Sequence, residues 1–220
     1  MFLSRRGLVY WNTRSLVGIC LHLVASMGLV ALVCGAKVTA AEPAAAPRRV
    51  EAFSLADAGG RLHTRDEWRD KRAIVVFFLG AECPVSNGYS PAMRALSARY
   101  AKRGVACYGV HVDAMLSAAD AAGHAEEYGL PFTILLDPEQ TLAGMVGARV
   151  TPDAVVARPD GTVVYCGRID DRYSIEGKRR DDPTTHELVD AIEAVLEGKM
   201  PIVRETQAYG CPLPKLRAPR

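Results

Sequence analysis

Cys83 is the residue of this sequence whose type and position best suit chemistry. It follows the apolar run at residues 73–79, which is typical of a strand buried on both faces, and it precedes a segment predicted to be helical. Unpaired N–H groups and the positive end of a helix dipole favour a thiolate there, so we expect a pKa below about 8.5. Gly80, Asn87 and Gly88 indicate a loop-like edge. We therefore expect the Cys83 sulfur to be exposed; a buried, inert cysteine is the alternative.

The other cysteines differ in their surroundings. Cys20 and Cys34 lie in the first forty residues, whereas Cys107 and Cys166 lie inside apolar runs and are interpreted as core residues. Cys211 stands in a segment that is rich in proline, has no helical periodicity and offers no packing reason for a cysteine. Physically, such a segment could bring a second thiol to Cys83. The open alternative is an exposed thiol that pairs with another molecule or with nothing.

The histidines show no spacing typical of a metal site, and we predict no resident metal and no cofactor. His63, His111, His124 and His186 are far apart in the sequence. His111 ends a predicted strand and could approach Cys83, although the favoured interpretation is a strand-end histidine with a structural hydrogen bond.

The charge of the chain gives no reason to propose a nucleic-acid partner. The 220 residues carry a formal net charge of +2, and the first forty residues contain Arg5, Arg6, Arg14 and Lys37 but no acidic residue. The rest of the chain has 23 Lys and Arg against 25 Asp and Glu, in mixed order. A near-neutral surface of mixed charge does not attract a phosphate backbone.

Residues 1–40 have the pattern of an export signal. A basic start precedes an apolar stretch, and Val38, Thr39 and Ala40 fit a cleavage site before Ala41. A retained membrane anchor is the alternative, since about 18 apolar residues can just span a bilayer. In either case we expect the body outside the cytoplasm, periplasmic or secreted. The predicted organisation is a linker at 41–50, one domain at 51–200 and a C-terminal tail at 201–220.

The body has the pattern of an α/β fold with a central mixed sheet flanked by helices on both faces. Ser90 is predicted to cap the first helix, and residues 184–187 have the pattern of a capping box for the last. A small leading hairpin is predicted at 51–60. The elements after it have the order β-α-β-α-β-α-β-β-α: strand 73–79, helix 90–100, strand 105–112, helix 117–128, strand 132–136, helix 140–146, strands 153–158 and 162–168, and helix 184–198.

Residues 75–84, with Pro91 after the cysteine, resemble the thioredoxin-like redoxin superfamily. This superfamily includes thioredoxins, peroxiredoxins of the AhpC/TSA type and secreted redoxin-domain proteins. Residues 53–57 resemble the start of a redoxin domain, and the resemblance extends over about residues 50–200. Val150, Thr151 and Pro152 resemble the family's cis-proline loop, which implies a cis bond at Thr151–Pro152 beside Cys83. It also implies a thioredoxin-like fold.

The resemblance implies substrate-binding positions and exposes two departures from the family pattern. Pro84 and Ser86 beside the cysteine, and Thr151 and Pro152 in the loop, are expected to shape the substrate groove. Ser86 stands where thioredoxins carry their second cysteine, and Gly80 stands where peroxiredoxins place a threonine. A second thiol must therefore come from elsewhere. Gly210 and Cys211 resemble the Gly-Cys ending of some secreted redoxin-domain proteins, so Cys211 is the candidate resolving thiol.

These observations predict an exported thiol–disulfide oxidoreductase or thiol-dependent peroxidase with an antioxidant or redox-homeostasis role. Cys83 would attack a disulfide or a peroxide, and Cys211 would resolve the product. The expected partners are a protein or small-molecule thiol or disulfide and an unidentified reductant, with a membrane involved only if the N-terminal segment is retained. The alternatives are a non-catalytic thioredoxin-like binding module and a copper-handling protein that uses Cys83 and Cys211, with His111 as a further ligand.

Overall fold

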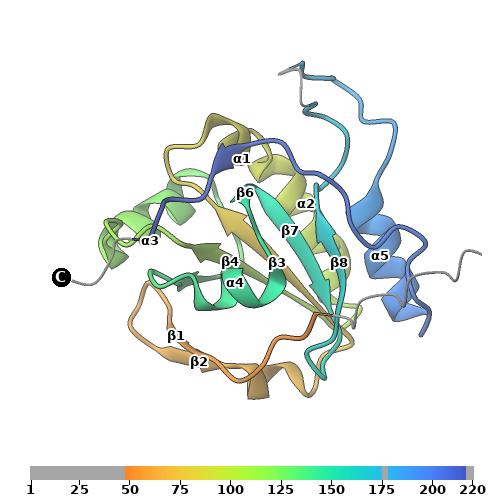
Figure 1. Cartoon of the computed structure of the whole chain (residues 1–220), viewed down its shortest axis with the longest axis horizontal. Helices are drawn as coiled ribbons and strands as arrows, with labels where there is room; N and C mark the ends of the chain where they lie inside the picture. The colour runs from red at the N-terminus through yellow and green to blue at the C-terminus, as the bar shows by residue number, and fades with distance from the viewer. Residues whose placement is uncertain (1–47, 175–177, 217–220) are drawn as a thin grey trace, which may run out of the picture. The chain divides into compact units, whose positions relative to one another are not determined.

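A five-stranded sheet forms the centre of the computed structural model, which describes residues 48–174 and 178–216. Its strand order is β5-β4-β3-β7-β8 (Figure 1). The strands are β3 (Ala73–Leu79), β4 (Val105–His111), β5 (Thr133–Leu136), β7 (Asp153–Ala157) and β8 (Val163–Gly167). The first three run parallel, while β7 is antiparallel to β3 and to β8. The predicted mixed sheet is confirmed.

Strand β3 lies in the middle of the sheet, and all seven of its residues are buried. Successive side chains of a strand point to opposite faces, so an uninterrupted apolar run supplies two cores at once. One core receives Ala73, Val75, Phe77 and Leu79, and the other receives Ile74, Val76 and Phe78. Because both faces of β3 are fixed by packing, its carboxyl end, where Cys83 follows, is held firmly.

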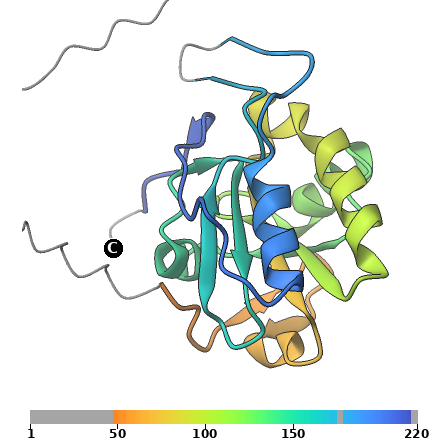
Figure 2. The same ribbon diagram turned by 90° about the vertical axis from the view of Figure 1, so that its right-hand side faces the viewer.

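Helices cover both faces of the sheet, as predicted. Helices α2 (Ser90–Ala101), α3 (Ala118–Glu127) and α5 (Glu187–Leu196) contribute buried residues to one core. The short helix α4 (Thr141–Val146) packs on the other face, together with the strands β1 (Ser54–Ala56) and β2 (Leu62–Thr64) and the 3-10 helix η1 (Arg65–Trp68). Figure 2 shows α5 and α2 lying side by side in front of the sheet. The predicted leading hairpin is confirmed by the antiparallel pairing of β1 with β2.

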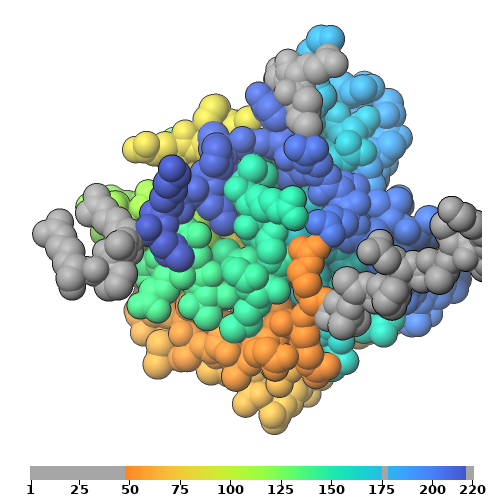
Figure 3. Space-filling view, in the orientation of Figure 1, coloured from red at the N-terminus to blue at the C-terminus, as the bar shows by residue number. Residues whose placement is uncertain are grey.

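The C-terminal segment is docked on the body, which corrects the expectation of a mobile tail. The Cys166 N–H donates to the Arg204 carbonyl at 3.1 Å, and the Thr206 N–H donates to the Cys166 carbonyl at 3.2 Å. Further on, β9 (Cys211–Pro212) pairs antiparallel with β6 (Val150–Thr151). Figures 1 and 3 show this segment crossing one face of the body. Two separate sets of backbone hydrogen bonds therefore hold it in place.

The ordered body begins before residue 51, so the predicted linker is too long at its end. The Val50 N–H donates to the Gly161 carbonyl and the Val163 N–H donates to the Arg48 carbonyl, at 2.8 and 2.9 Å. The predicted export signal or anchor at 1–40, its cleavage site, and linker residues 41–47 lie outside the described residues. Within residues 48–174 and 178–216, no helix is long and apolar enough to cross a membrane.

Two predicted helix caps are wrong, and at the second one tertiary partners take the side chains involved. Tyr89 is the N-cap of α2, and Ser90 is buried within the helix. Helix α5 has His186 as its N-cap without a side-chain cap bond. The Thr184 hydroxyl donates instead to the Asp171 carboxylate at 2.6 Å, and the Glu187 carboxylate accepts from Arg168 at 3.1 Å.

Asp137 generates a test of the fold. Its carboxylate is fully buried and accepts from the Thr141 and Ala143 N–H groups at 2.8 and 3.0 Å, which satisfies the start of α4. We expect Asp137→Ala to lower the free energy of unfolding by about 1–2 kcal/mol in urea denaturation. Asp137→Asn keeps one carbonyl acceptor and should lose less. Equal losses in the two variants would contradict this role.

Candidate active site

Cys83 lies between β3 and the short helix α1 (Pro84–Gly88), as predicted. It is the N-cap of α1, and the Ser86 N–H donates to the Cys83 sulfur at 3.4 Å. Pro84 occupies the first helical position, where its missing N–H costs no hydrogen bond. The start of α1 thus aims the Ser86 N–H at the sulfur.

The loop that faces Cys83 contains a cis peptide bond at Thr151–Pro152, which confirms the prediction. The Cys83 sulfur lies 3.0 Å from the Thr151 carbonyl oxygen, to which the protonated thiol can donate. Gly80 makes this approach possible. A Cβ atom at residue 80 would lie 2.5 Å from the Thr151 hydroxyl oxygen and 2.8 Å from the Cys83 Cβ. The Thr151 hydroxyl therefore stands where a side chain at position 80 would begin.

Cys211 is brought to Cys83 by the pairing of β9 with β6. In this pairing, Thr151 and Cys211 are direct partners, and the Cys211 thiol lies close enough to Cys83 for the two groups to shift one another's pKa. Gly210 allows the segment to lie this close, because a Cβ there would be 2.0 Å from the Thr151 carbonyl oxygen. Both cysteines are free thiols in this structure. Two thiols far apart in the sequence are thus neighbours across one loop.

The two thiols of the site have opposite pKa shifts. Burial raises the pKa of Cys83, but hydrogen bonds from the Cys211 thiol, the Thr151 hydroxyl and the Ser86 and Cys211 N–H groups outweigh it. The pKa of Cys83 therefore lies below its ordinary value. Burial, the hydrogen bond to Cys83 and the negative charge of its thiolate raise the pKa of Cys211 to about 11. The arrangement is an activated thiolate beside a thiol that donates to it.

The expectation of an exposed Cys83 is wrong, since only 3% of this residue is accessible. The cis-proline loop and the docked C-terminal segment contact the sulfur, and Cys211 is itself half-buried. The burial is not that of an inert core cysteine, because polar donors surround the sulfur. A reactant must therefore displace part of this cover to reach it.

The expected substrate-binding residues lie around the sulfur with different exposure. Pro84 is exposed at the rim, whereas Ser86, Thr151 and Pro152 are buried. The Ser86 hydroxyl accepts from the Gly80 N–H at 3.3 Å. Ser86 thus supports the loop before Cys83, and its role toward a substrate, like those of Thr151 and Pro152, stays a prediction.

The remaining described cysteines are held as thiols by burial. Burial raises the pKa of Cys107 to about 11 and that of Cys166 to about 12. Cys166 is buried, as expected of a core residue, while Cys107 is half-buried. Both lie in strands and neither touches Cys83 through a described interaction. Their reactivity is therefore expected to be low.

His111 meets another histidine rather than Cys83. Its ring lies edge-on to that of His124, with the centroids 5.0 Å apart. Sequence reasoning missed His124 and its partner Asn87, because residues in α1 and α3 come together only through the tertiary fold. Among the described residues, no three His, Cys, Asp or Glu side chains form a group that could hold a metal ion.

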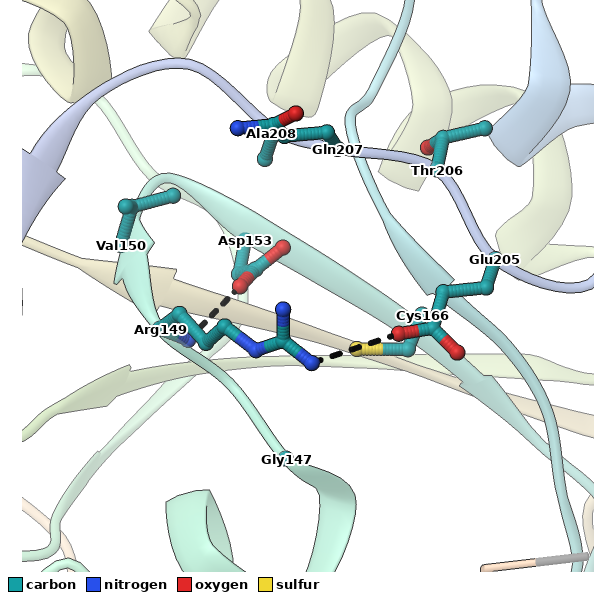
Figure 4. A pocket seen from close by; sticks show the side chains of 9 residues that line it. All are labelled: Gly147, Arg149, Val150, Asp153, Cys166, Glu205, Thr206, Gln207 and Ala208. Atoms are coloured by element: carbon teal, nitrogen blue, oxygen red, sulfur yellow. Dashed lines mark hydrogen bonds and ion pairs between the residues drawn. The ribbon is translucent and has the colours of Figure 1, made fainter.

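A small polar pocket of about 100 Å³ lies beside the site, beneath residues 205–208 (Figure 4). The Arg149 N–H donates to the Asp153 carboxylate at 2.9 Å, and the Arg149 guanidinium lies 3.7 Å from the Glu205 carboxylate. Arg48 forms a further ion pair with Glu205. These ion pairs join the C-terminal segment to the body. The pocket therefore lies at the contact that holds this segment, and with it Cys211, near Cys83.

Comparisons with known proteins identify a family and similar solved structures. A model of the AhpC/TSA family matches residues 46–166, which is more than half of the chain. A hypothetical protein from Sinorhizobium meliloti 1021 is 31% identical, with a TM-score of 0.67 over 76% of this chain and 92% of that one. An uncharacterized conserved protein from Geobacillus kaustophilus is 26% identical, with a TM-score of 0.68 over 78% and 93%.

A more distant structural relative supports the fold alone. A candidate thioredoxin from Neisseria meningitidis is 19% identical and has a TM-score of 0.53 over 69% of this chain and 91% of that one. No curated protein matches the chain significantly.

The opposite pKa shifts of the two thiols give a prediction about titration. Thiolate absorbance assigned to Cys83, as the difference between the reduced protein and Cys83→Ser, should rise at a pH below the ordinary range of about 8.5–9. Cys211→Ala removes a donor to the thiolate and should move this rise to higher pH. A Cys83 that ionises only above its ordinary range would contradict the described electrostatics.

The close approach of Gly210 to Thr151 gives a second prediction. Gly210→Ala places a Cβ against backbone atoms that cannot yield, so β9 should detach from β6. We expect faster alkylation of Cys83 by iodoacetamide together with a higher Cys83 pKa. Gly144→Ala in α4 is the matched control, because a Cβ there meets nothing within 4 Å. Unchanged alkylation in Gly210→Ala would show that β9 does not cover the sulfur.

Proposed function

Since the chain belongs to the AhpC/TSA family, whose members carry out thiol redox chemistry, we propose that it is a thiol–disulfide oxidoreductase. In this proposal, Cys83 is the nucleophile and Cys211 is the resolving thiol. The observation that carries it is the direct pairing of Cys211 with Thr151, which places a protonated thiol against the activated Cys83 sulfur. Cys211 supplies the thiol that is missing at Ser86.

The reaction proceeds in two exchanges. The Cys83 thiolate attacks one sulfur of a substrate disulfide, the substrate S–S bond breaks, and one substrate thiolate leaves. Cys211 then loses its proton to the departing thiolate or to solvent and attacks the Cys83 sulfur. The second substrate thiol leaves and a Cys83–Cys211 disulfide remains. The substrate gains two electrons, and an external thiol reductant restores the pair.

The charge on Cys83 controls when Cys211 can react in the second exchange. The negative charge on Cys83 contributes to the raised pKa of Cys211. Once Cys83 is in a mixed disulfide, this charge and its hydrogen bond are gone, so the pKa of Cys211 falls. The resolving thiol therefore becomes a better nucleophile only after the first exchange has occurred.

A substrate can reach Cys83 only if β9 moves away from the sulfur. The β6–β9 pairing involves only two residues on each strand, so opening it breaks few hydrogen bonds. The attachment of Arg204 and Thr206 to Cys166 lies elsewhere on the body and can persist. We propose that β9 detaches to admit the substrate and returns to deliver Cys211.

Peroxide reduction is a second candidate, which the position of the Thr151 hydroxyl favours. This hydroxyl lies where a side chain at Gly80 would begin, beside the Cys83 sulfur. It can serve in place of the threonine that peroxiredoxins carry three residues before their cysteine. The Cys83 thiolate would attack the O–O bond to form a sulfenic acid and release an alcohol or water. Cys211 would then form the disulfide and release water.

The proposed setting is an oxidising compartment outside the cytoplasm, with the export pattern of residues 1–40 as its support. Partners of this proposal are protein or small-molecule disulfides and a thiol reductant. A non-catalytic binding module would leave the paired thiols unused. Copper handling could use the two sulfurs, although the described residues offer no group of three ligands.

The test is a comparison of cysteine variants of the reduced protein. We expect the wild type to reduce one equivalent of glutathione disulfide or hydrogen peroxide by itself, and to turn over repeatedly when a thiol reductant is added. Cys83→Ser should be inactive in both cases. Cys211→Ser should stop after one turnover, as a mixed disulfide with glutathione or as a sulfenic acid, both identifiable by mass spectrometry. Cys107→Ser is the control and should behave as wild type. Activity in Cys83→Ser would overturn the proposal, and tight Cu(I) binding without turnover would favour the metal alternative.

A further inference from the structure

The turn before Cys83 is held by the side chains of His111 and Asn87, and Asn87 is in turn bonded to a second buried histidine, His124. The turn comprises Leu79, Gly80 and Ala81, and the carbonyl groups on either side of Gly80 are both hydrogen-bond acceptors. The His111 ring bonds to the Leu79 carbonyl. The Asn87 side-chain amide donates to the Ala81 carbonyl at 2.8 Å. The carbonyls flanking the glycine are thus fixed independently.

Asn87 connects α1 to α3 through His124. Its amide oxygen lies 2.9 Å from His124 Nε2, and its backbone N–H donates to the Cys83 carbonyl at 2.9 Å. Because the amide nitrogen of Asn87 is used on Ala81, its oxygen must accept, so His124 carries its proton on Nε2. The orientation of the Asn87 amide, and with it the turn, is therefore fixed by the Nε2–H group of His124.

The two histidines support one another in the interior. They are 2% and 6% accessible, and the His124 ring also lies 4.9 Å from that of Tyr128. His111 Nε2 and His124 Nδ1 have no partner in the described structure. Burial is the main cause that lowers the pKa of both, to about 4 for His111. Both rings are consequently neutral near pH 7.

The turn has little room to shift without disturbing the sulfur. Gly80 is packed against Thr151 and Cys83, and its N–H donates to the Ser86 hydroxyl. A rotation of either flanking peptide would alter the distance from the Cys83 sulfur to the Ser86 N–H and to Thr151. The donors that stabilise the thiolate depend on these distances.

We propose that His124, acting through Asn87, and His111 are positioning residues that hold the 79–81 turn and thereby orient the Cys83 sulfur toward its donors. The inference rests on the proposed role of Cys83 as the nucleophile. Neither histidine touches the sulfur through a described interaction. Both act through the backbone carbonyls that precede it.

The simpler role of the two histidines would be filling the core. In that case, replacing either one would lower the free energy of unfolding and leave the Cys83 pKa unchanged. If the histidines position the turn, replacing either one should shift the Cys83 pKa in the folded protein. A side chain that restores the hydrogen bond without the ring should then return the Cys83 pKa toward its wild-type value.

The experiment measures the Cys83 pKa by thiolate absorbance and its reaction rate with glutathione disulfide in the reduced full chain. We expect His124→Leu and Asn87→Ala each to raise the Cys83 pKa by roughly one unit and to slow the reaction several-fold at neutral pH. The double variant should show no larger shift, because both residues belong to one chain of contacts. His124→Gln, whose amide can donate to Asn87, should restore most of the wild-type value. His111→Leu should also raise the Cys83 pKa.

His63→Leu is the matched control for removal of a buried histidine. His63 bonds Asp57 and Glu67 in the leading hairpin, on the other core of the sheet, so its loss should lower stability without moving the Cys83 pKa. Asn87 is only half-buried, which keeps the test available if His124→Leu does not fold. An unchanged Cys83 pKa in folded Asn87→Ala would overturn the inference. Because the titration needs no turnover, it decides positioning even if Cys83→Ser proves active and the proposed function fails.

Discussion

Thr151 contacts both cysteines of the candidate site and the two glycines packed beside them, and the arrangement of these residues depends on it. Its carbonyl faces the Cys83 sulfur, its hydroxyl donates to the thiolate, and its backbone pairs with Cys211. Gly80 and Gly210 approach it so closely that neither position could carry a side chain without displacing atoms of Thr151 or Cys83. The two glycines and the two cysteines are thus consequences of one loop geometry.

This geometry makes the two thiols unlike each other although they are neighbours. Cys83 has donors from the start of a helix and from Thr151, whereas Cys211 faces a thiolate and has no comparable set of donors. The buried thiolate therefore depends on polar contacts from α1, the cis-proline loop and the C-terminal segment together. In the function proposed for this member of the AhpC/TSA family, the same contacts bring Cys211 to the position from which it would supply the thiol that Ser86 lacks.

Local sequence patterns predicted most of the fold. Residues 73–79 are apolar throughout because both faces of β3 are buried, so their pattern indicates the strand without knowledge of its neighbours. The cis bond at Thr151–Pro152 and the position of Cys83 at a helix start were predicted from the residues around them and from the family resemblance.

The errors concern interactions that depend on distant residues. Cys83 is buried because residue 211 lies over it, which nothing near residue 83 indicates. The predicted capping box is wrong because the Thr184 hydroxyl donates to Asp171 and the Glu187 carboxylate accepts from Arg168. The contact of Asn87 with His124 joins two helices separated by a strand, so no spacing in the sequence indicates it.

The late position of Cys211 along the chain has a consequence for folding. Its contact with Cys83 closes a loop of roughly 130 residues, whereas β3, α1 and α2 are assembled from neighbouring segments. The central sheet can therefore form around Cys83 before β9 is in place. During this interval the sulfur already has its helix donor but is not yet covered by β9, so a newly made chain can form mixed disulfides by exchange with any disulfide compound around it. The docking of β9 ends that exposure, and the rate of this last step decides how much of the protein matures unmodified.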